Sequence, residues 1–175
     1  GASAAIVCSD AAARRLGLAR AARVRAADSR TGQDRAPDDY ANHVTHLLAA
    51  HVYETSGLAP DDMDFAEVHD ASSIGEILQV EALRLCPPGG AGPAAQAGEL
   101  SLGGRIPVNV SGGLVSKGHP LGATGCGMVH EIVTQLRGEA GARQVENARL
   151  AIAENSGGFY GVEDGMSAIT VLEKA

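Results

Sequence analysis

The chain contains no tryptophan, and aromatic residues make up only 3% of its 175 residues. The large rings that fill much of a typical hydrophobic core are therefore scarce. Because 45% of the sequence is still hydrophobic, the core must be built from Ala, Val, Leu and Ile. A chain of this length has room for one domain with a core of its own.

Basic residues are fewer than acidic ones, and the formal net charge is −7. This balance argues against a nucleic-acid-binding protein, which needs a basic surface. No apolar run reaches the ~18 residues of a membrane span, so we expect no transmembrane helix and no membrane partner. The first eight residues lack the basic region of a signal peptide, and we expect a cytoplasmic location.

Cysteine is also sparse. Cys8, Cys86 and Cys126 form no Cys-x-x-Cys pair and their number is odd, so we expect buried, reduced thiols rather than a disulfide framework. A metal site is not expected either. Three histidines share one predicted helix, but one of them faces away and no cysteine or carboxylate completes a ligand set. These are His43, His46 and His51.

Hydrophobic periodicity predicts alternating strands and helices. Strands are expected at residues 3–8, 23–28, 64–68, 105–110, 149–154 and 166–174, and helices at 10–20, 38–56, 73–86 and 128–136. The Pro- and Gly-rich segment 87–104 is expected to be a surface loop, and a long loop is expected between the last two strands. This order predicts a layered α/β fold with a mixed, mostly parallel sheet and a closing antiparallel hairpin.

The segment from Asn109 to Gly125 is the most unusual part of the sequence, because it holds five glycines and places His119 among them. A strand is expected before it and an amphipathic helix after it. Glycine is used where a positive φ or a close approach is required, so a tight loop is predicted here. At a helix start the helix dipole disfavours a cationic ring, and a neutral His119 would be a competent general base.

Two further segments carry polar groups at predicted strand ends. The first is Glu67-Val-His-Asp-Ala-Ser-Ser73, in which His69 and Asp70 directly follow a strand. The second is Glu154-Asn-Ser-Gly-Gly-Phe-Tyr-Gly161. Together with Gly118-His-Pro-Leu-Gly-Ala-Thr-Gly125, they resemble the signatures of the thiolase family, in particular its sterol-carrier-protein-linked branch. The similarity covers only the second half of a thiolase.

The resemblance implies a domain organisation. Residues 1–10 would be the last strand of a missing N-terminal half, and residues 11–175 would be the C-terminal thiolase-like domain. That domain would form one half of a five-layered fold in which helices sandwich two sheets.

The resemblance also implies roles for particular residues. His119 would deprotonate a nucleophilic cysteine, and His69 would help to form an oxyanion site. The remaining expected site residues are Gly118, Asn155, Ser156, Gly157 and Gly158 for substrate binding, with Tyr160 as a proton donor. The sequence departs from the family pattern at two places: the cysteine expected after His69-Asp70 is Ala71, and the segment 155–161 has no Cys-x-Gly.

The function implied is that of an acyltransferase acting on acyl-CoA thioesters by Claisen condensation or thiolysis. Its nucleophilic cysteine would lie in the absent N-terminal half, so these 175 residues alone would be inactive. Coenzyme A would be a substrate or product, and no permanently bound cofactor is expected. A homodimer, or a hetero-oligomer with a small OB-fold-type partner, is the expected assembly.

Two alternatives remain open. One is a thiolase-like lipid-transfer or aldolase subunit that cleaves a carbon–carbon bond without cysteine. The other is a non-catalytic thiolase-like scaffold that binds a partner protein.

Overall fold

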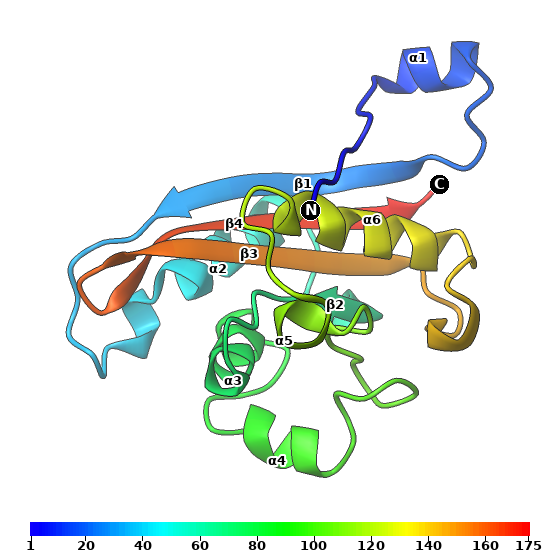
Figure 1. The fold of residues 1–175 in the computed structure, drawn as a ribbon. Helices are drawn as coiled ribbons and strands as arrows, with labels where there is room; N and C mark the ends of the chain where they lie inside the picture. The colour runs from blue at the N-terminus through cyan, green and yellow to red at the C-terminus, as the bar shows by residue number, and fades with distance from the viewer.

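The centre of the structure, a computed structural model that describes residues 1–175, is a four-stranded sheet with strand order β1-β4-β3-β2 (Figure 1). The strands are β1 (Ala22–Thr31), β2 (Phe65–Glu67), β3 (Leu150–Tyr160) and β4 (Glu163–Lys174). The layered α/β class and the closing antiparallel hairpin are confirmed. The sheet is mixed but not mostly parallel, because β4 is antiparallel to both of its neighbours and only β2 and β3 run parallel.

Helices cover both faces of this sheet. The α-helices are α1 (Asp10–Arg15), α2 (Val44–Ser56), α3 (Ser73–Ala82), α4 (Ala91–Gln96), α5 (Gly113–Lys117) and α6 (Thr124–Leu136). Three single turns of 3-10 helix are η1 (Tyr40–Asn42), η2 (Pro60–Asp62) and η3 (Gly141–Arg143). No helix combines the length and the apolar character needed to cross a bilayer.

The alternation of side chains along β3 divides the core into two clusters. Leu150 and Ile152 belong to the cluster under α2 and α3, whereas Ala151 and Ala153 belong to the cluster under α6. Successive residues of a strand point to opposite faces, which explains the division. The small alanines therefore lie on the face that α6 covers.

The segment 87–104 is not a plain surface loop, as the sequence suggested, because it contains α4. Ala91, Ala94 and Leu100 of this segment are buried. The Glu81 carboxylate accepts hydrogen bonds from the backbone amides of Gly89 (2.9 Å) and Ala91 (3.0 Å), which holds the start of α4 against α3. That contact comes from a residue outside the segment, so the composition of the segment gave no sign of it.

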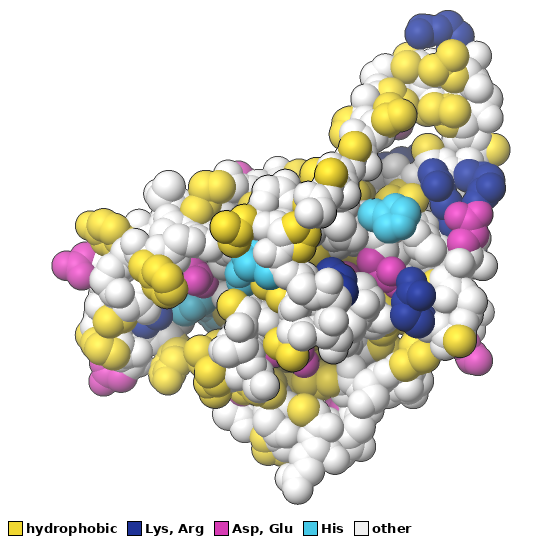
Figure 2. Space-filling model, in the orientation of Figure 1, with side chains coloured by type: hydrophobic (Ala, Val, Ile, Leu, Met, Phe, Trp, Pro, Cys, Tyr) yellow, Lys and Arg dark blue, Asp and Glu magenta, His cyan; other side chains and the backbone are white.

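Residues 1–21 form an N-terminal arm that projects from the sheet (Figure 1). Residues 3–8 were expected to be a buried strand, but they pair with no strand here, and Ile6 and Val7 are 97% and 82% exposed. A strand needs a neighbour for its backbone groups, and none of the 175 residues supplies one. Figure 2 shows hydrophobic side chains along the arm and basic side chains at its tip.

The hairpin between β3 and β4 is tighter than expected. The predicted long loop is a two-residue turn, since pairing continues to Tyr160 and Glu163. The strand expected at 105–110 is reduced to one bridge, between Val108 and Ala66 of β2. Pro107 cannot donate a backbone hydrogen bond, which limits regular pairing there.

Candidate active site

Two histidines that lie fifty residues apart in the sequence come together just beyond the C-terminal end of β2, beside the middle of β3. His69 follows β2 and His119 precedes α6, and their ring centroids are 4.9 Å apart with perpendicular planes. The Asn155 side chain of β3 joins them, with its Oδ1 atom 3.1 Å from His69 Nδ1. The structure therefore brings together one polar residue from each of the three segments that the sequence singled out.

The loop before α5 fixes the chain around His69. The Asn109 Oδ1 atom accepts a hydrogen bond from the Val68 amide at 2.8 Å. Asn109 has a φ of 52°, a left-handed conformation that asparagine tolerates better than most residues. Its Nδ2 atom donates to Glu76 of α3 at 3.2 Å, so one side chain ties the end of β2 to the next helix.

Asp70, directly after His69, binds the first turn of α5. Its buried carboxylate accepts hydrogen bonds from the amides of Leu114 (2.6 Å) and Val115 (3.4 Å). Gly113 has a φ of 60°, and a Cβ atom there would fall inside the Asp70 carboxylate. The glycine is therefore required both by its backbone angle and by the space that Asp70 occupies.

Glu67, directly before this turn, is also buried and binds the same loop. It accepts hydrogen bonds from the Ser111 amide (3.0 Å) and the Ser111 hydroxyl (2.5 Å), and Lys117 Nζ lies 3.5 Å away. Burial raises the pKa of the Glu67 carboxyl, and the Ser111 hydrogen bond and the Lys117 charge oppose that rise. The loop 109–117 and the segment 67–70 thus form one interlocked unit that positions His69.

His119 is held by the helix that follows it. Its Nδ1 atom lies 2.7 Å from Thr124 Oγ1, and the Thr124 hydroxyl is 3.3 Å from the Pro120 carbonyl. When the hydroxyl donates to that carbonyl, Nδ1 must donate to the hydroxyl oxygen, which leaves a free lone pair on Nε2. This is the tautomer that a general base requires.

The orientation of the Asn155 side-chain amide sets the tautomer of a neutral His69. With Oδ1 facing the ring, His69 Nδ1 donates and the neutral ring presents a lone pair on Nε2. With the amide turned by 180°, Asn155 donates to Nδ1 and the ring presents an Nε2–H donor. Only the second arrangement gives a neutral His69 that can donate to an oxyanion.

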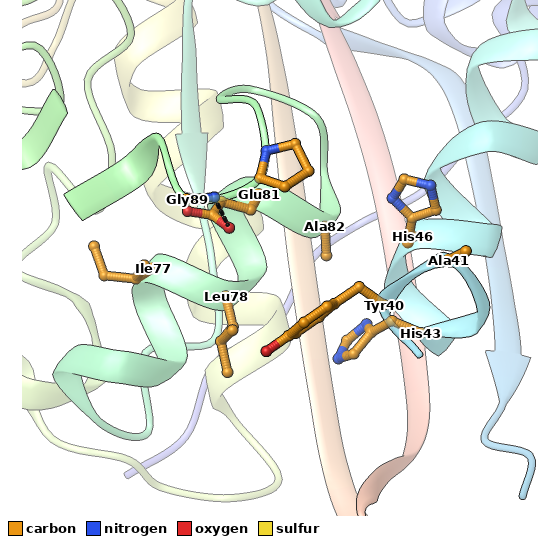
Figure 3. A pocket seen from close by; sticks show the side chains of 10 residues that line it. Tyr40, Ala41, His43, His46, Ile77, Leu78, Glu81, Ala82 and Gly89 are labelled. Carbon is orange, nitrogen blue, oxygen red and sulfur yellow. Dashed lines mark hydrogen bonds between the residues drawn. The ribbon is translucent and has the colours of Figure 1, made fainter. Parts of the chain in front are cut away.

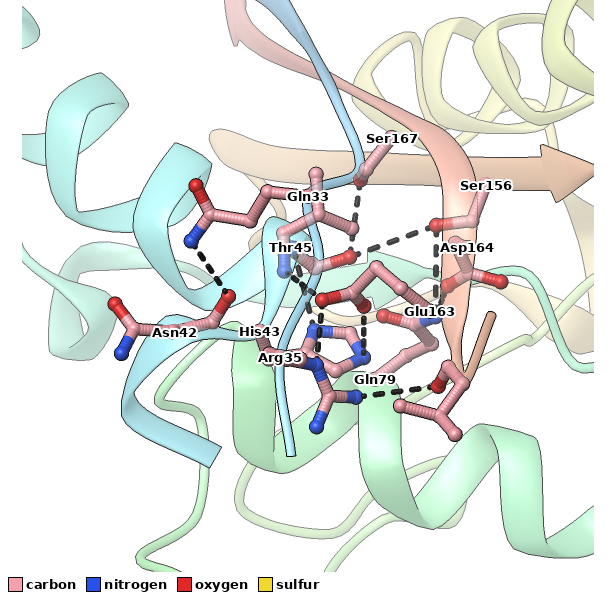
Figure 4. Close-up of polar contacts among 12 residues, drawn as sticks. Gln33, Arg35, Asn42, His43, Thr45, Gln79, Ser156, Glu163, Asp164 and Ser167 are labelled. Carbon is pink, nitrogen blue, oxygen red and sulfur yellow. Dashed lines mark hydrogen bonds and ion pairs between the residues drawn. The ribbon is translucent and has the colours of Figure 1, made fainter. Parts of the chain in front are cut away.

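Behind the pair lies a buried polar cluster centred on Glu154. Its carboxylate accepts from the His69 amide (3.1 Å) and from the hydroxyls of Ser156 and Ser167. Figure 4 shows Thr45 reaching both serines from α2. Burial raises the pKa of Glu154, opposed by the Ser156 hydrogen bond. The sequence pattern of β3 gave no sign of this acidic residue in the core.

The other predicted site residues lie at different distances from the pair along the chain. Ser156 is buried and bonded to Glu154, and the exposed Gly157 and Gly158 lie on the hairpin. Tyr160 ends β3, five residues beyond Asn155, which along a strand is about 16 Å. Gly118 follows α5 with a φ of 89°, next to His119. Tyr160 therefore lies away from the histidine pair, whereas Gly118 lies beside it.

The expectation of buried thiols is wrong for two of the three cysteines. Cys8 and Cys126 are exposed, and Cys86 is buried in the core with a pKa raised by burial. The position after Asp70 is Ala71. No three His, Cys, Asp or Glu side chains lie close enough to hold a metal ion.

The fold defined above is that of thiolase-type enzymes. The structure matches the Ltp2-ChsH2(DUF35) aldolase with a TM-score of 0.71 and 22% identity, over 87% of this chain and 39% of that one. It matches human mitochondrial 3-ketoacyl-CoA thiolase with a TM-score of 0.61 and 20% identity, over 95% of this chain and 34% of that one.

The chain belongs to the thiolase family, because residues 27–172 match the family described as thiolase C-terminal domain-like. Rat sterol carrier protein 2 is 52% identical over 105 residues, 60% of this chain and 19% of that protein. An acetyl-CoA acetyltransferase of Methanothermobacter thermautotrophicus is 49% identical over 113 residues, 65% of this chain and 30% of the relative.

The benzoylsuccinyl-CoA thiolase subunit BbsB of Thauera aromatica is 36% identical over 161 residues, which is 90% of this chain and 42% of that subunit. The chain thus spans less than half the length of each of these relatives.

Proposed function

We propose that this chain is the C-terminal part of a thiolase-type acyltransferase that acts on acyl-CoA thioesters. The observation that carries the proposal is the histidine pair, with ring centroids 4.9 Å apart, where the end of β2 and the loop before α6 meet beside β3. Two imidazoles at this distance can serve one reacting group, one as a base and the other as a hydrogen-bond donor. Coenzyme A is then a substrate or product.

In this proposal His119 removes the proton from a nucleophilic cysteine outside these 175 residues, through its Nε2 atom. The cysteine then attacks the thioester carbonyl. His69, with the Asn155 amide turned so that it donates to Nδ1, donates from Nε2 to the negative charge that develops on the oxygen. In the condensation direction the carbon–sulfur bond to coenzyme A then breaks, the coenzyme A thiolate takes the proton from His119, and the acyl group stays on the cysteine. Forming a covalent acyl-enzyme divides one difficult carbon–carbon step into two easier ones. Glu67, Asp70 and Asn109 act only through His69, by fixing the backbone that carries it.

The test is made in the full-length protein with an acyl-CoA substrate. We expect His119→Ala to lower kcat/KM by about 10²–10⁴-fold, the usual contribution of a general base. His130→Ala is the matched control, because His130 is an exposed histidine of α6 and should leave the rate unchanged. Equal rates for the wild type and His119→Ala would refute the role of the pair.

A second candidate is carbon–carbon bond cleavage without cysteine, as in an aldolase subunit. Two observations favour it: Ala71 stands after Asp70, where a cysteine was expected, and the match to the aldolase has the higher TM-score. Mass spectrometry of the full-length protein after exposure to acyl-CoA separates the two candidates. A cysteine-bound acyl group supports the transferase, and turnover without any acylated residue supports the aldolase.

The proposed assembly follows the sequence expectation of a homodimer, or of a hetero-oligomer with a small OB-fold-type protein. The name of BbsB, a thiolase subunit, supports a multi-chain assembly in this family. Analytical ultracentrifugation of the full-length protein measures the assembly directly.

A further inference from the structure

A cavity of about 600 Å³ lies between α2 and α3, and it is not part of the histidine pair. None of His69, His119 and Asn155 lines it. One wall comes from η1 and the start of α2, and the other from α3 (Figure 3). The side chains used below are Tyr40, Ala41 and His46 on the first wall, and Ile77, Leu78 and Ala82 on the second.

The carboxylate in the cavity wall is that of Glu81, and it already accepts hydrogen bonds from the protein backbone. Both oxygens of Glu81 accept backbone amides, from Gly89 and Ala91, as Figure 3 shows for Gly89. The carboxylate therefore serves to hold the start of α4. A cationic ligand would have to compete with these two hydrogen bonds.

The two histidines of the wall are engaged as well. His43 Nδ1 accepts from the Thr45 amide at 3.2 Å, and its Nε2 faces Glu163 at 3.5 Å (Figure 4). His46 Nε2 lies 3.2 Å from the Arg84 guanidinium, which donates to it. Burial lowers the pKa of both histidines, so both rings are neutral at pH 7. The wall thus presents no free charge.

What remains is an apolar surface with one hydroxyl, that of Tyr40 at the opening. Tyr40 is 60% exposed and Leu78 is 38% exposed, and Figure 3 shows them approaching from the two walls. Small-molecule sites occupy about 300–1,000 Å³ and combine an apolar lining with few polar groups. A polypeptide segment fits less well, because its buried amides and carbonyls would find no partners.

We propose that this cavity binds an uncharged hydrocarbon group, such as an alkyl chain or a fused ring, at a site separate from the histidine pair. This proposal does not rest on the proposed acyltransferase reaction. A chain of contacts nevertheless links the cavity to the pair, because Gln79 of α3 donates to Ser156 (3.4 Å) and Asp164 (3.1 Å), and Ser156 follows Asn155 in β3. A ligand that moves α3 would therefore act on the strand that carries Asn155.

The experiment titrates the full-length protein with diphenylhexatriene, an uncharged fluorescent hydrocarbon. Ala41→Trp places a large ring at the cavity wall, and we expect it to raise the Kd at least tenfold. Ala142→Trp is the matched control, because Ala142 is also an exposed alanine in a single turn of 3-10 helix but does not line the cavity. Leu78→Trp blocks the cavity from the opposite wall if Ala41→Trp fails to fold.

Competition with decanol and with decanoyl-CoA identifies what is recognised. Displacement of the probe by both compounds supports the proposal, because they share only the hydrocarbon chain. Displacement by decanoyl-CoA alone overturns it, as does a wild-type protein that binds no probe, or cavity variants that bind as tightly as Ala142→Trp. His119→Ala is expected to bind the probe normally, so a failure of the proposed reaction and a failure of this proposal are distinguishable.

Discussion

At the scale of single residues, the site depends on carboxyl groups that lie in the protein interior. Glu67 and Glu154 are both completely buried, and burial raises the pKa of each. Each accepts hydrogen bonds from backbone amides and hydroxyls, which replace part of its lost hydration. Because a buried charge is costly unless it is paired, these groups make stability depend on pH.

Glu154→Gln tests this dependence. A carboxyl whose pKa is raised on folding contributes stability that is complete below the unfolded pKa of about 4.3 and is lost as pH rises through the folded pKa. We therefore expect the wild type to lose more stability than Glu154→Gln between pH 5 and pH 8, by on the order of 1 kcal/mol for each unit of pKa shift. Urea denaturation at several pH values measures the difference.

The control for this comparison is Glu146→Gln, because Glu146 is exposed and should follow the wild type. The buried histidines His43 and His46 have lowered pKa values, so their contribution has the opposite sign and is lost as pH falls. The contribution of the two histidines is the same in the wild type, Glu154→Gln and Glu146→Gln, so it cancels when their stabilities are compared. Parallel curves for Glu154→Gln and the wild type would contradict the prediction.

Proton transfer at the site leads to a second prediction at this scale. Tyr160 lies about 16 Å along β3 from Asn155, so Tyr160→Phe should leave the thiolysis rate within about twofold of wild type. Ala71→Cys places a thiol next to Asp70, where the sterol-carrier-linked branch is expected to have one, and should raise that rate. Both are measured in the full-length protein with one acyl-CoA. A large loss in Tyr160→Phe would return that residue to the mechanism.

At the scale of the secondary-structure elements, the sequence predicted those that carry their own pattern. The apolar stripe of α6, the alternation of β1 and the runs of β3 and β4 were all visible in the chain. Elements that depend on distant contacts were not: α4 needs Glu81, and residues 3–8 remain exposed for lack of a neighbouring strand. Hydrophobic periodicity shows which face of a segment can be buried. It does not show whether the rest of the chain supplies a strand or side chain to pack against that face.

The same distinction applies to the candidate site. His69, His119 and Asn155 were identified because polar residues at strand ends and in glycine-rich loops meet at one edge of a sheet. Glu154 was missed as a buried group because nothing in its strand separates a buried acid from an exposed one. Tyr160 was misplaced because the two-residue turn carries the strand past the site.

Gly113→Ala tests the interlocked loop as an element. The new Cβ atom would overlap the Asp70 carboxylate, and the φ of 60° disfavours any side chain, so we expect a loss of about 1–3 kcal/mol. Gly127→Ala is the control, since nothing lies within 4 Å of its added methyl group in α6, and alanine favours helix there by up to about 1 kcal/mol. Thermal denaturation compares the two, and equal melting temperatures would contradict the role of Gly113.

At the scale of the whole molecule, these 175 residues hold the proposed base and the proposed oxyanion donor, but none of their cysteines is assigned as the nucleophile. A cysteine reacts as its thiolate, in an accessible and electropositive position. Cys86 is buried with a raised pKa, and Cys8 and Cys126 are exposed. In the proposed function, the domain completes a site rather than forming one alone.

We accordingly expect the 175-residue chain to remain unacylated when it is incubated with an acyl-CoA. Intact-mass measurement detects the added acyl group, and peptide mapping assigns it to Cys8, Cys86 or Cys126. The full-length protein under the same conditions is the positive control. Rapid acylation of Cys126, which is exposed in the first turn of α6, would show that the domain carries its own nucleophile.

The interlocked loop also makes the site observable without a substrate. The amides of Val68, His69, Ser111 and Leu114 donate to side-chain oxygens of Asn109, Glu154, Glu67 and Asp70, rather than to backbone carbonyls. Their deuterium exchange therefore reports the opening of these side-chain contacts, whereas the amides of β3 and β4 report the opening of the sheet. If the four exchange together and faster than the sheet, the site opens as one cooperative unit while the rest of the domain stays folded.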